Sequence, residues 1–106
     1  MRTFPKQLAE LQRRVEAHGQ VLRGQSRDEL IALGAGDAEQ WDVAGRAALV
    51  AVIVEPREAD SIRVVVQAFM PSKWLPFVSS VALDGFYQLS SGAIEPIPAE
   101  EWREFD

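Results

Sequence analysis

The stretch RAALVAVIVEPREADSIRVVVQAFM, residues 46–70, decides the fold of this chain. Two runs rich in β-branched side chains flank a short polar segment that contains Pro56, and this arrangement is typical of a β-hairpin. A loop over residues 56–60 places Val54 opposite Ile62 and sets the remaining pairs of the two strands. The other segments are interpreted by how they can pack against this hairpin.

The hairpin has two faces of different character, because alternate residues of a strand point to opposite sides of a sheet. One face is entirely apolar, and we expect it to be the most buried part of the molecule. This core face consists of Ala48, Val50, Val52, Val54, Ile62, Val64, Val66 and Ala68. The other face is mixed, and this second face consists of Ala47, Leu49, Ala51, Ile53, Arg63, Val65, Gln67 and Phe69.

The composition is that of a globular domain. The chain has 106 residues, of which 47% are hydrophobic and 25% charged, so we expect one domain over residues 1–106. It contains no cysteine, which excludes disulfides, thiolate metal ligands and a cysteine nucleophile and favours the cytoplasm. No signal peptide is visible, and the longest apolar run, Ala47 to Val54, is too short for a membrane span. We therefore expect a soluble cytoplasmic protein with no membrane partner.

Charge is distributed unevenly along the chain. The net charge is −5, but the segment through Arg27 carries an excess of basic residues and the remainder an excess of acidic ones. A basic helix with Arg2, Lys6, Arg13 and Arg14 is a possible contact for nucleic acid. The acidic surface as a whole repels phosphate, and no aromatic side chains are interleaved with the bases, so nucleic acid is not an expected partner.

The N-terminal segment has the features of an α-helix. Thr3 is a suitable N-cap, Pro5 suits the first turn, and Leu8, Leu11 and Val15 follow at helical spacing. His18 and Gly19 are typical of a helix end, which predicts that the helix stops there. The apolar stripe of this helix is expected to pack on the core face.

A second, short helix is predicted after residue 26. Ser26 and Glu29 have the spacing of a capping box, and Gly34 or Gly36 ends the helix. Residues 37–41 are interpreted as a further single turn, with Trp41 folding back on the core. Residues 42–45 then lead into the hairpin.

The segment after Met70 combines a proline-bracketed connection with further strands. Residues 71–77 contain two prolines around Trp74 and are expected to be an ordered connection, not a strand. Further predicted elements are a third strand over 78–83, a turn at Asp84–Gly85, a hairpin of 86–89 with 93–97 around the loop 90–92, and a terminal helical turn with Trp102 and Phe105. The fold class is therefore α+β, with two N-terminal helices packed on a mostly antiparallel sheet of three to five strands and a short C-terminal helical turn.

The residues available for catalysis do not form a recognisable set. His18 is the single histidine, and a metal site would depend on carboxylates for its remaining ligands, whereas zinc prefers Cys and His. The acidic residues have structural explanations that require no catalysis. Those at 28–29 suit a helix cap, those at 55, 58 and 60 suit a hairpin loop, and those at 100–101 suit a solvated helix start. Glu55, Glu58 and Asp60 also lack calcium-loop spacing. We expect no catalytic residue, no metal and no cofactor.

The second face and the connection that follows it offer the strongest functional signal. An apolar face with polar residues among its members is typical of an interface, and tryptophan is favoured at interaction hot spots. The predicted interaction residues are Leu49, Ile53, Val65, Phe69, Trp74 and Phe77. They predict a small non-enzymatic binding module that contacts a protein partner or a second copy as a homodimer, one version being an acidic inhibitor or immunity-type protein.

The alternative is an enzyme or small-molecule binder that uses carboxylates in a pocket between the helices and the sheet. An enclosed cavity lined by convergent acids favours that alternative, whereas a flat aromatic patch favours the binding module.

Overall fold

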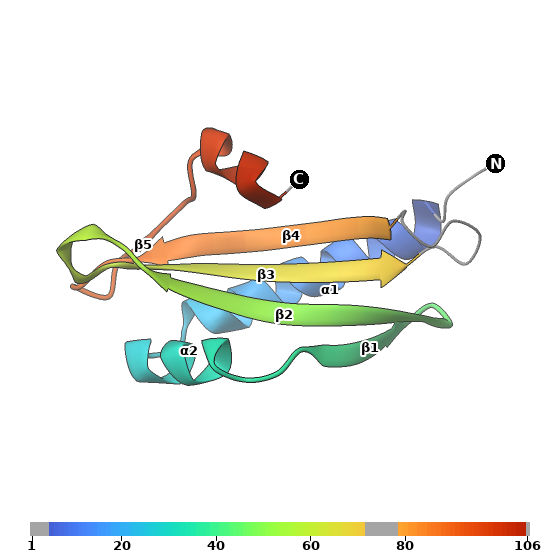
Figure 1. The fold of residues 1–106 in the computed structure, drawn as a ribbon, viewed down its shortest axis with the longest axis horizontal. Helices are drawn as coiled ribbons and strands as arrows, with labels where there is room; N and C mark the ends of the chain where they lie inside the picture. Colours follow the sequence, from blue (N-terminus) through green and yellow to red (C-terminus); the bar gives the residue numbers. More distant parts are fainter. Residues whose placement is uncertain (1–4, 72–78, 106) are drawn as a thin grey trace.

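Five strands form one antiparallel sheet in which the spatial order follows the chain, β1-β2-β3-β4-β5 (Figure 1). The computed structural model describes residues 5–71 and 79–105. The strands are β1 (Glu39–Val43), β2 (Arg46–Pro56), β3 (Ile62–Pro71), β4 (Ser79–Gln88) and β5 (Ile94–Glu95). Two helices and two 3-10 segments complete the described elements: α1 (Pro5–Arg23), α2 (Arg27–Gly34), η1 (Glu58–Asp60) and η2 (Ala99–Phe105). The protein is therefore an α+β fold, as its sequence predicts.

Both helices pack on the core face of the sheet. The longer helix α1 lies behind the strands in Figure 1 and contacts β3 and β4, whereas α2 contacts β2. The short segment η2 stands apart from both helices, on the β4 side of the sheet. The sheet therefore has one face under helices and one face without them.

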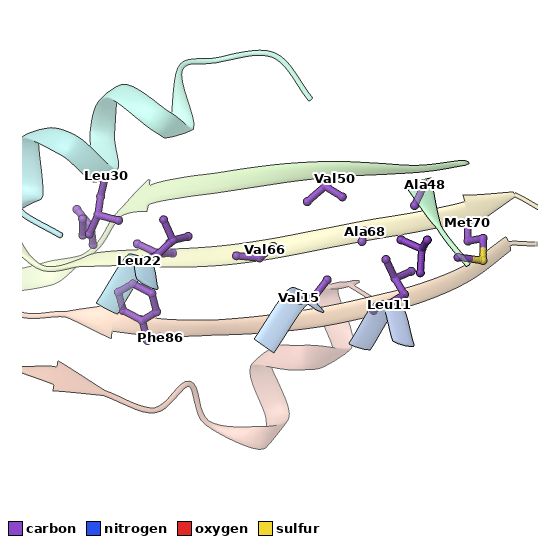
Figure 2. Close-up of a cluster of buried hydrophobic side chains, with 14 residues drawn as sticks. Leu11, Val15, Leu22, Leu30, Ala48, Val50, Val66, Ala68, Met70 and Phe86 are labelled. Atoms are coloured by element: carbon purple, nitrogen blue, oxygen red, sulfur yellow. The ribbon is translucent and has the colours of Figure 1, made fainter. Parts of the chain in front are cut away.

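The core lies between α1, α2 and the apolar face of the sheet. Figure 2 shows Leu11, Val15 and Leu22 of α1 with strand residues that include Val66 and Phe86, all of them fully buried. The predicted core face is confirmed in most of its positions, because its members are either buried or packed against the buried cluster. Buried members are Ala48, Val50, Ile62, Val64, Val66 and Ala68, and half-buried members are Val52 and Val54.

The register of the central hairpin differs from the predicted one by two residues. Val54 pairs with Val64, and Pro56, which the sequence places in the loop, pairs with Ile62. The loop is instead closed around Glu58–Asp60, where Arg57 N donates to Ser61 O at 2.8 Å. A shift of two leaves each side chain on its predicted face, since the period of a strand is two.

The end predicted for α1 is wrong, because the helix continues through Gly19 to Arg23. A Cβ on Gly19 would lie 1.9 Å from Asp84 Oδ2 of β4. Glycine here permits close approach of helix and sheet, and it does not terminate the helix. The extra turn brings Leu22 into the core.

The second helix begins as predicted. Ser26 is the N-cap of α2, its hydroxyl accepts from Glu29 N at 3.2 Å, and the Glu29 carboxylate accepts from Ser26 N at 2.9 Å. This capping box is confirmed. The predicted helical turn over residues 37–41 is wrong, because this segment is largely taken up by strand β1. Trp41 nevertheless packs against the core as expected.

The turn between β1 and β2 explains why β1 was not predicted from the sequence. Val43 pairs with Arg46, so the loop has two residues, Ala44 and Gly45, and both have positive φ. That geometry is the tight turn favoured in β-hairpins, where glycine and asparagine are usual and alanine is not. Asp42 supports the turn by accepting from Gly45 N at 3.1 Å.

The turn predicted at Asp84–Gly85 is also wrong, because β4 runs through both residues without interruption. A Cβ on Gly85 would lie 2.6 Å from the backbone oxygen of Val64, so the glycine permits close contact within the sheet. The predicted loop over residues 90–92 is confirmed, and it joins β4 to the short strand β5. The predicted terminal helical turn is also confirmed, as η2.

Candidate functional site

The second face carries rows of side chains set by the pairing of adjacent strands. In order along the sheet, the rows are Leu49 with Phe69, Ala51 with Gln67 and Leu83, Ile53 with Val65 and Gly85, and Glu55 with Arg63 and Tyr87. The helices α1 and α2 lie on the other side of the sheet. The cover over each row of the second face therefore has to come from another part of the chain.

Residues 96–105, here called the strap, cover one end of the second face. A Cβ on Gly85 would lie 2.9 Å from Ile97 Cδ1 and 3.2 Å from Trp102 Cη2, so both strap side chains sit directly on this glycine. Val65, which pairs with Gly85, is fully buried although it does not belong to the cluster under the helices. The strap therefore seals the row that contains Val65.

A buried arginine anchors this end of the face. The side chain of Arg63 is only 1% exposed. Its Nε donates to Glu55 Oε1 at 3.2 Å, and its Nη1 donates to Glu101 Oε1 of the strap at 3.0 Å. A buried guanidinium is costly unless it is paired, and these two carboxylates supply the compensation.

Tyr87 joins the same cluster from β4. Its hydroxyl donates to Glu101 Oε1, the oxygen that also accepts from Arg63. Burial raises the pKa of Tyr87 above its usual value, and the hydrogen bond and negative charge of Glu101 raise this pKa further. Tyr87 therefore remains a neutral donor at physiological pH, and Glu101 ties the strap to both β3 and β4.

The opposite end of the second face is largely apolar, and no element within residues 5–71 and 79–105 covers it as the strap covers the first end. Leu49 is 49% exposed, and Ile53 and Phe69 are half-buried beside it. These three residues are here called the open patch. Gln40 pairs with Leu49, and Gln67 lies with Ala51 in the row between Leu49 and Ile53. The surface therefore mixes apolar and polar side chains, as in many protein interfaces.

The six residues predicted as interaction residues have different positions. Leu49, Ile53 and Phe69 lie together in the open patch, and Val65 lies in the adjoining row, buried beneath the strap. Trp74 and Phe77 lie outside the described residues.

Two hollows lie between the helices and the sheet. An open one of about 350 Å³ is lined by Arg27, Ile31, Gly34, Ala35, Val54, Pro56 and Ile62, with no carboxylate among them. A more enclosed cavity of about 160 Å³ is lined by His18, Ala32, Leu33, Gly36, Asp37, Glu39, Trp41, Val50 and Val52. The prediction that His18 ends the helix is wrong, because α1 continues past it. His18 instead packs edge-to-face on Trp41, with ring centroids 5.6 Å apart. Pockets for small molecules usually measure about 300–1,000 Å³, so this cavity is small for a ligand.

A larger, open depression of about 810 Å³ adjoins the Arg63 cluster. It is lined by Pro56, Arg57, Glu58, Ser61, Tyr87, Leu89, Glu95 and Glu101. The carboxylates of Glu58, Glu95 and Glu101 line it together with the guanidinium of Arg57. The depression therefore carries charges of both signs and is open to solvent.

Within residues 5–71 and 79–105, no group of three or more His, Cys, Asp or Glu side chains is arranged to hold a metal ion. No helix in the described part of the chain is long and apolar enough to cross a membrane. Comparisons with protein-family models, curated proteins and solved structures found no match. The function therefore has to be argued from the geometry of this chain.

Sequence reasoning missed the cluster around Arg63. The signal was present, because an arginine in the middle of a valine-rich strand requires a partner wherever that strand is buried. The predicted register placed Glu55 opposite Ser61, whereas the observed register places it opposite Arg63. Glu101 comes from a segment far along the chain, and no local pattern connects it with β3.

Proposed function

We propose that this protein is a small non-enzymatic binding module that docks a protein on the open patch. The observation that carries the proposal is the half-exposed Leu49 beside the half-buried Phe69, with Ile53 two rows further along the same sheet face. Contiguous apolar surface with a polar rim is characteristic of protein interfaces. The occupant is a second copy or a foreign protein.

Self-association is the simplest form of this proposal, since two-fold dimers are the commonest oligomers. An acidic inhibitor or immunity-type protein is the version with a foreign partner, and the net charge of −5 suits a basic partner. The absence of cysteine is consistent with a cytoplasmic setting. Trp74 and Phe77 remain proposed contacts of the same surface.

The alternative of an enzyme or small-molecule binder has less support. It requires a ligand-sized pocket with convergent acids between helices and sheet. The cavity that contains Asp37 and Glu39 measures about 160 Å³, and the open hollow of about 350 Å³ beside α2 is lined by no carboxylate. The acids of the larger depression are already engaged in part, since Glu101 accepts from both Arg63 and Tyr87.

Light scattering of the wild type and the variant Leu49→Asp tests the proposal. The wild type is expected to reach twice the chain mass of 11.8 kDa as concentration rises, and the variant is expected to stay at the chain mass. Val21→Asp is the matched control, because Val21 is 60% exposed on α1, away from the second face. A wild type that stays at the chain mass at every concentration rules out self-association. A dimer that is lost in Val21→Asp but kept in Leu49→Asp rules out the open patch as its interface.

A further inference from the structure

Strand β4 lies at the edge of the sheet for most of its length. Within residues 5–71 and 79–105, β5 is the one strand on its outer side, and it pairs only with Tyr87 and Gln88. An edge of this kind presents backbone N–H and C=O groups that can pair with a strand of another chain. The contacts made by these groups therefore decide whether the edge is open.

The groups on this edge belong to alternate residues of β4. In an antiparallel sheet, residues that bond to one neighbouring strand alternate with residues that face the opposite side. Leu89 N donates to Ala93 O at 2.8 Å, which places the backbone groups of Leu89 on the β5 side. Leu83 and Gly85 differ from Leu89 by an even number of residues, so their N–H and C=O groups point to the same edge.

The carboxamide of Gln12, on α1, pairs with Leu83 as a neighbouring strand would. Gln12 Nε2 donates to Leu83 O at 2.9 Å, and Gln12 Oε1 accepts from Leu83 N at 3.3 Å. A side-chain amide carries the same donor and acceptor as a peptide group, so it satisfies both backbone groups of Leu83 at once. Gln12 Nε2 also donates to Glu16 Oε2 at 3.0 Å, which holds the carboxamide in this orientation.

Arg23 contacts the next residue along the same edge. Its Nη2 donates to Gly85 O at 3.0 Å, and its guanidinium is held by Asp84, which lies 2.8 Å from Nη1 and 3.2 Å from Nη2. The approach of α1 to β4 depends on Gly19, because a Cβ there would lie 1.9 Å from Asp84 Oδ2. Helix α1 lies along β4 in Figure 1, and it supplies side chains to the edge as well as to the core.

We propose that Gln12 closes the edge of β4 to strands of other chains, with Arg23 as a second contact. Removal of the carboxamide converts this edge into a surface that binds an extended strand, since the N–H and C=O of Leu83 are then available for pairing. The open patch lies on the second face of β2 and β3, so the edge is a separate surface. The inference therefore does not depend on the proposed function.

Hydrogen exchange at the Leu83 amide tests the contact. The wild type should protect this amide more than that of Ser90 in the exposed β4–β5 loop. Gln12→Leu keeps a good helix former of similar size and should speed exchange at Leu83 by about 2- to 10-fold, which corresponds to one lost hydrogen bond. Gln20→Leu, at an exposed position of the same helix, is the matched control and should leave the rate unchanged. A wild-type Leu83 amide as unprotected as that of Ser90 overturns the proposal, as does an unchanged rate in Gln12→Leu.

Light scattering tests the consequence for association. Gln12→Leu is combined with Leu49→Asp, which disrupts the open patch, and the matched control combines Gln20→Leu with Leu49→Asp. As concentration rises, the mass of the Gln12→Leu protein should exceed that of the control, and its Leu83 amide should regain protection in the assembled fraction. Equal masses for the two proteins at every concentration overturn the proposal. Assemblies in which the Leu83 amide stays unprotected overturn it as well.

Discussion

The two faces of the sheet are covered by different elements and to different extents. On the core face, the long apolar stripe of α1 and the short helix α2 cover a largely apolar set of side chains. Its polar members Asp84 and Gln88 are bonded to Arg23 and to the backbone of Gln25. On the second face, the strap covers one end and is held by the buried side chain of Arg63, whereas Leu49 at the other end is half-exposed among the described residues. The difference shows that the two faces of one sheet carry different amounts of exposed apolar surface.

Burial against the strap makes Val65 the most sensitive position of the second face. Val65→Asp should destabilise the domain by roughly 4 kcal/mol or more, because a carboxylate would be buried without a partner. Denaturant unfolding measures this change. Leu49→Asp, on the same face but half-exposed, should stay within about 0.5 kcal/mol of the wild type. Equal effects at the two positions would mean that the strap does not divide this face into a covered and an open part.

Removal of two methyl groups from the core face should have an intermediate effect. Val64 is fully buried beneath the helices, and Val64→Ala should reduce the free energy of unfolding by about 1–3 kcal/mol through lost transfer energy and a residual cavity. The same denaturant experiment measures it. A change of only a few tenths would show that the core face is less tightly packed than its burial indicates.

The cap of α2 should contribute somewhat less. Ser26→Ala removes the hydroxyl that accepts from Glu29 N and should cost about 0.5–2 kcal/mol. Ser90→Ala, in the exposed β4–β5 loop, is a suitable control and should have little effect. An unchanged stability for Ser26→Ala would mean that α2 is held on the sheet by packing alone.

The Arg63 cluster should give the second face a response to alkaline pH. The pKa of Tyr87 is raised in the folded state, so its stabilising contribution is present below the ordinary tyrosine value of 10.0 and is lost as pH rises through the higher folded value. Tyr87 is the single tyrosine of the chain, so ultraviolet difference titration reports it alone. The midpoint is expected above 10.0 in the wild type and closer to 10.0 in Glu101→Gln. Identical midpoints would mean that Glu101 does not influence the phenol.

The core face could be read from the sequence because its signals are local. Period-two alternation identified its side chains, and the capping box of Ser26 marked the start of α2. A two-residue error in register did no harm there, since it preserved the face of every residue. The fold class depends on such repeating patterns, and it was predicted correctly.

The contacts of the second face and the roles of Gly19 and Gly85 could not be predicted in this way, because they depend on residues that are distant in the sequence. Gly19 and Gly85 have the appearance of a helix end and a turn, yet each serves close packing inside a regular element. The two-residue register error, harmless for the core face, separated Glu55 from Arg63. Glu101 lies 38 residues from Arg63, so their contact appears only in the folded chain.

The central claim is that association uses the second face and leaves the core face unchanged. A dilution series on methyl-labelled protein tests it most directly. The methyl resonances of Leu49 and Ile53 should shift with concentration, whereas those of Val64 and Val66, fully buried on the core face, should stay constant. Constant shifts at all of these positions, or shifts confined to Val64 and Val66, would contradict the account.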